Sequence, residues 1–150
     1  MPQQPAIELS PTTGAITIEG VEMVLAAGLR LDSARSALAN FYRRSIDHNN
    51  GYEWLSFGGL SFAGRPCNIS ACFKETKLTE VHLGVSLSDI QEAGWPSRQD
   101  IEREVAFVRA ALSKSLHRSF SSGSEKFNWG QVWSVFDPKG FIASAGVRYV

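Results

Sequence analysis

The segment that most constrains the fold is the aromatic-rich run from residue 127 to residue 150. Two apolar runs flank the tetrapeptide Asp137-Pro138-Lys139-Gly140. Proline presets the backbone angle at the second position of a β-turn, whereas Asp suits the first position and Gly the last. The pattern therefore predicts a β-hairpin with one strand on each side of this turn. Because termini fray unless they are tied down, we expect the second strand to dock in a larger sheet.

Further strands are predicted between residues 52 and 87. Residues 79–87 alternate between apolar and polar side chains, which predicts a half-buried strand. Residues 52–62 contain Gly58-Gly59 and predict one bent strand or two short ones, and residues 68–73 predict another. Together these segments indicate an antiparallel meander. Residues 15–19 predict an additional strand, whereas residues 21–31 fit a helix and a strand equally well.

Two segments predict α-helices. The stronger one runs from Arg98 to about Leu116, with Ser97 as its N-cap and acidic residues near its start. Its apolar stripe has helical spacing and consists of Ile101, Val105, Val108, Leu112 and Leu116. The weaker one begins after Asp32 and is expected to run from residue 33 to about residue 45. The serine-rich residues 118–126 indicate a flexible loop.

These elements predict an α+β fold, with one antiparallel β-sheet of five to seven strands and two α-helices packed on one face. The length of 150 residues suits a single domain, residues 1–150. Residues 1–14 carry three prolines and predict an extended N-terminal arm, within which residues 7–9 are a candidate short strand. The spacing from Gly58 to Gly130 equals that from Pro66 to Pro138, which suggests a possible α-β-β duplication.

The charge and the apolar runs limit the partners and the compartment. Fifteen basic residues balance fifteen acidic ones, so we expect neither nucleic acid nor a membrane surface as a partner. No apolar run approaches the roughly 20 residues that span a bilayer. The N-terminus lacks a basic and apolar leader, and Cys67 and Cys72 are too few for a disulfide scaffold. We therefore expect a cytoplasmic protein, with prior removal of a signal peptide as the alternative.

The sequence contains no motif for catalysis, metal binding or cofactor binding. It has no phosphate-binding glycine loop, no dinucleotide fingerprint and no nucleophile elbow. His48, His82 and His117 have no neighbours at metal-ligand spacing. Arg65 near Cys67 could activate a thiol, but we interpret this cysteine as structural because no base is placed beside it. We therefore expect no enzyme activity, no catalytic residue, no metal and no cofactor.

The aromatic residues are the most informative part of the sequence for function. Four tryptophans and nine phenylalanines are many for a chain of this length. Tryptophan and tyrosine pair a large apolar body with a polar tip, so they serve both in cores and as interface anchors. We select five of them as candidates for binding a partner, namely Trp95, Trp129, Trp133, Tyr52 and Trp54. Trp95 lies beside a proline in a connection, which predicts exposure.

The residues of the meander, 52–87, and the closing segment, 129–149, carry a resemblance to a known class of protein. In size and helix-sheet layout the chain resembles the small cytoplasmic immunity proteins encoded beside bacterial secreted toxins, including those of type VI secretion and other polymorphic-toxin systems. The resemblance implies a non-enzymatic monomer or homodimer that binds a cognate protein toxin and occludes its active site. The alternatives are an adaptor or secretion chaperone, and a ligand-binding protein or enzyme with a pocket between helices and sheet.

Overall fold

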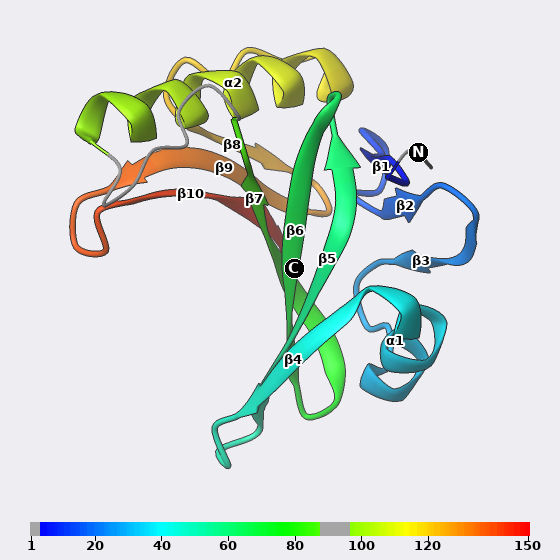
Figure 1. Ribbon diagram of the computed structural model, residues 1–150. Coiled ribbons are helices and arrows are strands. Elements are labelled where there is room, and N and C mark those ends of the chain that lie inside the picture. Colours follow the sequence, from blue (N-terminus) through cyan, green and yellow to red (C-terminus); the bar gives the residue numbers. More distant parts are fainter. Residues whose placement is uncertain (1–3, 88–96) are drawn as a thin grey trace.

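The computed structural model describes residues 4–87 and 97–150, and these residues form an α+β fold dominated by sheet. The main sheet is antiparallel and has seven strands (Figure 1). In spatial order the strands are β4 (Tyr42–Asp47), β5 (Tyr52–Phe62), β6 (Arg65–Lys74), β7 (Lys77–Val85), β10 (Ile142–Tyr149), β9 (Gly130–Asp137) and β8 (Ser124–Phe127). The predicted fold class, with an antiparallel sheet of up to seven strands and two α-helices, is confirmed.

The main sheet consists of two meanders joined side by side. Strands β4 to β7 form the first meander and β8 to β10 the second, and β7 pairs with β10 where His82 lies opposite Gly146. The predicted terminal hairpin is confirmed, because β9 and β10 pair along their whole length. Its turn is closed by the backbone amide of Lys139, which donates to Asp137 Oδ1 at 3.0 Å. The last strand of the sequence therefore lies inside the sheet, not at its edge.

A second, three-stranded sheet is formed near the N-terminus by β1 (Ile7–Leu9), β2 (Ile16–Ile18) and β3 (Val21–Leu25). It is tied to the second meander by hydrogen bonds from the side chains of Tyr149 and Trp129. The Tyr149 hydroxyl donates to the Gly14 carbonyl at 2.8 Å, and the Trp129 indole nitrogen donates to the Pro11 carbonyl at 3.2 Å. The segment predicted as an extended arm thus contains a strand and packs against the main sheet.

The longer helix, α2 (Arg98–Leu116), has the bounds that the sequence predicts. Ser97 Oγ accepts from the Asp100 amide, and the Asp100 carboxylate accepts from the Ser97 amide, so a capping box starts the helix. All five residues of the predicted apolar stripe are buried. The helix lies across β9 and β10, as Figure 1 shows. Neither described helix is both long and apolar enough to cross a membrane.

The prediction for the first helix is wrong in its second half. The helix α1 (Leu31–Ala37) begins before Asp32, which therefore is not its N-cap, and a short 3-10 helix, η1 (Ala39–Phe41), leads directly into β4. All six residues of β4 are exposed, so no apolar alternation marks this segment as a strand. Its strand conformation depends on pairing with β5, which overrides local propensity.

The remaining strands and the predicted duplication compare with the sequence predictions as follows. Residues 124–127 form β8 although the sequence predicts a loop there, and residues 21–25 form β3 where the pattern left helix and strand open. Gly58-Gly59 bends β5, as predicted, since the register with β6 shifts between Phe57 and Leu60. Four strands follow α1 and three follow α2, and the α-β-β duplication stays a hypothesis.

One face of the main sheet is covered by α2 and by the N-terminal sheet. The buried side chains on this face include Leu55, Ile69, Val81, Val132 and Val147. They form one apolar cluster with Ile7 and Leu9 of β1 and with Leu112 of α2. The hydrogen bonds from Tyr149 and Trp129 therefore anchor the N-terminal sheet, which is part of the apolar core.

We expect Tyr149→Phe to lower the free energy of unfolding by about 1.5 kcal/mol, because the buried Gly14 carbonyl loses its hydrogen-bond donor. Urea denaturation followed by circular dichroism measures this change. Tyr52→Phe is the matched control: its ring is 39% exposed, and the change should stay within about 0.5 kcal/mol. Equal effects of the two substitutions would contradict a structural role for the Tyr149 hydroxyl.

Candidate functional site

The face of the main sheet opposite α2 is the candidate site. Successive residues of a strand point to opposite faces, so the neighbours of the inward residues Ile69, Val81 and Val147 point outward. The strand register places five outward residues in one row across the sheet, namely Ser56, Ser70, His82, Gly146 and Trp133. The described helices and N-terminal strands pack on the other side. We call this outward surface the open face.

Three aromatic rings meet on the open face. The His82 ring lies between Trp54 and Trp133, with centroid distances of 4.9 Å and 5.3 Å and nearly perpendicular ring planes. Such edge-to-face contacts are favourable for aromatic pairs. Trp54, His82 and Trp133 are all half-buried, so each ring keeps part of its surface exposed to solvent. We call these three residues the aromatic row.

The aromatic row depends on small residues between the rings. Its members lie on β5, β7 and β9, which are alternate strands of the sheet. Neighbouring strands are about 4.8 Å apart, so rings on alternate strands meet only if the strand between them carries small side chains. Ser70 and Cys72 of β6 meet this need on one side, and Gly146 of β10 meets it on the other. A Cβ at Gly146 would lie 2.9 Å from the Trp133 ring and would also clash with the Val81 carbonyl oxygen.

A charged cluster borders the aromatic row. Glu80 accepts from His82 Nε2 at 2.6 Å through one carboxylate oxygen and pairs with Arg148 Nε at 3.4 Å through the other. The guanidinium of Arg148 also lies 5.3 Å from the centre of the Trp133 ring. The hydrogen bond from His82, with the nearby Arg148 charge, lowers the pKa of Glu80 despite its partial burial. Glu80 is therefore ionised at neutral pH and links β7 to β10 on this surface.

The structure brings together three of the five aromatic residues that the sequence analysis selects. Tyr52, Trp54 and Trp133 all point to the open face, and Tyr52 is exposed. Trp129 lies elsewhere, in the turn between β8 and β9, where it stacks on Phe127 at 4.6 Å. Trp95 lies outside the described residues. Trp129 is thus occupied by contacts within the molecule, while the other three form one surface.

Sequence analysis missed His82, Glu80 and Arg148 as members of this surface. The alternation of residues 79–87 does indicate that Glu80 and His82 point outward. It does not show that β10 lies beside β7 and brings Gly146 and Arg148 next to them. The missing information is the pairing of strands that are distant in the sequence.

The chemistry of the described residues gives no sign of a reactive centre. Burial raises the pKa of the Cys67 thiol to about 12, and burial also raises that of Cys72. Both thiols are free and stay protonated at neutral pH, which is the weakly nucleophilic form. Within residues 4–87 and 97–150, no group of three His, Cys, Asp or Glu side chains could hold a metal ion.

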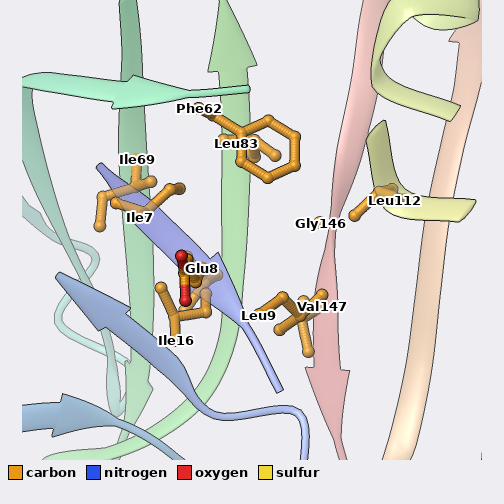
Figure 2. Close-up of a pocket in the computed structure, with 11 residues that line it drawn as sticks. Ile7, Glu8, Leu9, Ile16, Phe62, Ile69, Leu83, Leu112, Gly146 and Val147 are labelled. Atoms are coloured by element: carbon orange, nitrogen blue, oxygen red, sulfur yellow. The ribbon is translucent and has the colours of Figure 1, made fainter. Parts of the chain in front are cut away.

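One small apolar cavity lies between β1, the inward face of the main sheet and α2 (Figure 2). It has a volume of about 20 Å³. Ile7, Leu9, Phe62, Ile69 and Leu112 are among the residues that line it. A volume of this size suits about one water molecule, whereas small-molecule pockets have several hundred Å³. This cavity does not provide the ligand pocket that one alternative from the sequence requires.

Comparison with known proteins shows a likeness in fold. No family model matches the sequence, and no curated protein matches it. A chain in the solved structure of Rhs1-CT in complex with cognate immunity protein RhsI1 superposes with a TM-score of 0.52 at 11% sequence identity. The match covers 95% of the present chain and 86% of that chain. At this identity the match shows a fold shared with a chain of that toxin–immunity complex.

We expect Glu80→Gln to lower the free energy of unfolding by about 1 kcal/mol at pH 7, because ionised Glu80 loses its charge-assisted hydrogen bonds. A carboxylate whose pKa is lowered by folding stabilises the protein above its unfolded pKa of about 4.3 and loses this effect as the pH falls further. The difference between the two proteins should therefore shrink below about pH 4. Urea titrations at pH 7 and pH 3 measure it.

The exposed Glu102→Gln, which removes the same charge from an ion pair on α2, is the control and should change stability little at either pH. A loss for Glu80→Gln that is the same at pH 3 and pH 7 would disprove the electrostatic explanation.

We expect Gly146→Ala to destabilise the protein by about 2 kcal/mol and to alter tryptophan fluorescence, because the added methyl group pushes the Trp133 ring away from His82. Thermal unfolding and emission spectra measure these effects. Gly140→Ala is the control, since its Cβ would lie 3.3 Å from the nearest atom, in the Ile142 side chain. A stable Gly146→Ala protein with an unchanged spectrum would contradict the proposed packing.

Proposed function

We propose that this protein is an immunity protein that binds a cognate secreted bacterial toxin and neutralises it. The observation that carries the proposal is the match of nearly the whole chain to the fold of a chain from the complex of Rhs1-CT with its cognate immunity protein. An identity of 11% relates the folds alone, so the function is our inference. The absence of a reactive centre among the described residues agrees with a protein that works by binding.

We propose the open face as the surface that contacts the toxin. Trp54 and Trp133 offer partly exposed rings held in place by His82, and interface hot spots are enriched in such aromatic side chains. Rings fixed in the free protein lose little conformational entropy when a partner binds. Glu80 and Arg148 beside the rings supply charges of both signs, which favour one orientation of a partner over others.

In this proposal the protein acts in the bacterial cytoplasm and blocks the active site of a toxin delivered by type VI or related secretion. A standard interface buries about 800 Å² on each partner, and a seven-stranded sheet face accommodates such an area. Occlusion requires no chemistry from the inhibitor. It requires a rigid surface that is complementary to the toxin, and a sheet whose other face packs against α2 and the N-terminal sheet meets that requirement.

Co-expression with the protein encoded next to this gene tests the proposal. Under the proposal, the neighbour kills or arrests the host when expressed alone, and the two proteins together restore growth and purify as a stable complex. Equal killing with and without this protein would overturn the immunity function. Formation of a complex without restored growth would instead support the adaptor or secretion chaperone.

We expect Trp54→Ala and Trp133→Ala each to weaken toxin binding by about 30-fold, because each removes a large anchor from the interface. Isothermal titration calorimetry measures the change, at a temperature where circular dichroism shows both variants folded. Phe141→Ala is the matched control, because Phe141 is 46% exposed in the β9–β10 turn and its contact is with Phe136. If both tryptophan variants bind as tightly as the unaltered protein, the toxin uses another surface.

A further inference from the structure

A polar hollow adjoins the aromatic row on the open face. It has a volume of about 280 Å³ and lies at the β4 end of the sheet, where β4, β5 and β6 run side by side. Its lining includes two arginines, two serines and an asparagine, namely Arg43, Arg44, Ser56, Ser70 and Asn68. Ser56 and Ser70 belong to the same row across the sheet as His82, so the hollow and the aromatic row form one continuous surface.

The two arginines of the hollow carry uncompensated charge. Arg43 and Arg44 are exposed, and neither makes an ion pair with another described residue. Arg148, on the open face, differs from them because it pairs with Glu80. The hollow is therefore a local positive region on a chain whose total charge is zero.

The bend in β5 fixes the position of one of these arginines. A Cβ at Gly58 would lie 2.8 Å from Arg43 Nε, and a Cβ at Gly59 would lie 3.3 Å from an Arg43 terminal nitrogen. The Arg43 side chain thus lies flat against the glycine pair, in space that any larger residue would fill. Gly59 also has a φ of +78°, which glycine adopts without strain. The glycine pair therefore leaves room for a guanidinium at the rim of the hollow.

We propose that this hollow binds a carboxylate side chain of the toxin, an inference that rests on the proposed function. Guanidinium groups form paired, charge-assisted hydrogen bonds with carboxylates. The hydroxyls of Ser56 and Ser70 lie 3.3 Å apart, and the one that does not donate to the other provides a further donor at the floor of the hollow. The matching segment of the toxin carries an Asp or Glu beside an apolar residue, so that the carboxylate enters the hollow while the apolar residue contacts Trp54.

A protein carboxylate fits this surface better than a nucleic acid does. A polyanion running from the hollow along the aromatic row would meet the ionised carboxylate of Glu80. A single carboxylate in the hollow contacts Arg43 and Arg44 and does not extend along the aromatic row to Glu80. The positive region is thus local, whereas nucleic-acid surfaces spread several cations along a path.

The double variant Arg43→Gln with Arg44→Gln tests this inference against the toxin identified by co-expression. We expect at least 30-fold weaker binding in 50 mM NaCl and a smaller dependence of the dissociation constant on salt between 50 and 300 mM, because a charge-assisted contact is lost. The control combines Lys114→Gln with Lys139→Gln, which removes two charges from exposed positions on α2 and in the β9–β10 turn. Its dissociation constant should stay within twofold of the unaltered value.

A second variant places a carboxylate of the chain itself in the hollow. Asn68→Asp keeps the size of the side chain and lies outside the aromatic row, so it should pair with the arginines, keep the melting temperature and weaken toxin binding at least tenfold. A fluorescent 20-nucleotide single-stranded DNA serves as the competing probe and should show no binding that depends on Arg43 and Arg44. Should the double arginine variant fail to fold, Asn68→Asp decides the question.

The possible outcomes separate this inference from the proposed function. Tight toxin binding by the unaltered protein and by both hollow variants would overturn the carboxylate site and leave the immunity function standing. No binding by the unaltered protein would overturn the immunity function and this inference with it. Arginine-dependent DNA binding as tight as toxin binding would show a nucleic-acid site instead.

Discussion

The pairing of β10 with β7 is the constraint on which the rest of the structure depends. It joins two meanders that would otherwise be separate small sheets, and it brings Val147 beside Val81 in the core. The same contact places Gly146 next to His82 on the open face and leads Tyr149 to the N-terminal sheet. Because the paired strands are far apart in the sequence, closing this contact costs chain entropy that only the burial of a shared core offsets. Core and surface therefore form together.

Two tryptophans near each other in the sequence illustrate how the structure divides its aromatic residues between stability and recognition. Trp129 stacks on Phe127 and holds the Pro11 carbonyl, so its surface is used within the molecule. Trp133 lies within β9 on the open face, where its ring contacts His82 in the aromatic row. From composition alone, both tryptophans are equally good candidates for a core position and for a binding surface. The two residues differ because Trp129 lies in the turn between β8 and β9, whereas Trp133 lies within β9 and points to the open face.

Much of the fold was predictable from the sequence, because its strongest signals are local. The cap at Ser97 with the apolar stripe of α2, and the turn at residues 137–140, each have a cause within a few residues. The strand β4 was not predictable, since all its residues are exposed and its partner supplies the only reason for its conformation. The site was predictable in part: the aromatic types indicated Tyr52, Trp54 and Trp133. Their assembly with His82 depends on strand order, which no local pattern contains.

The small residues between the rings have a consequence for how such a surface evolves. Outward side chains contribute little to the apolar core, so under the proposed function substitutions there would alter toxin binding while the fold persists. The positions that carry rings are free to exchange one large side chain for another. The positions between them, Ser70 and Gly146, are not free, because a bulky residue there would separate the rings. Under the proposed function, new specificities would therefore arise most easily by changing the residues that carry rings and keeping the small residues between them.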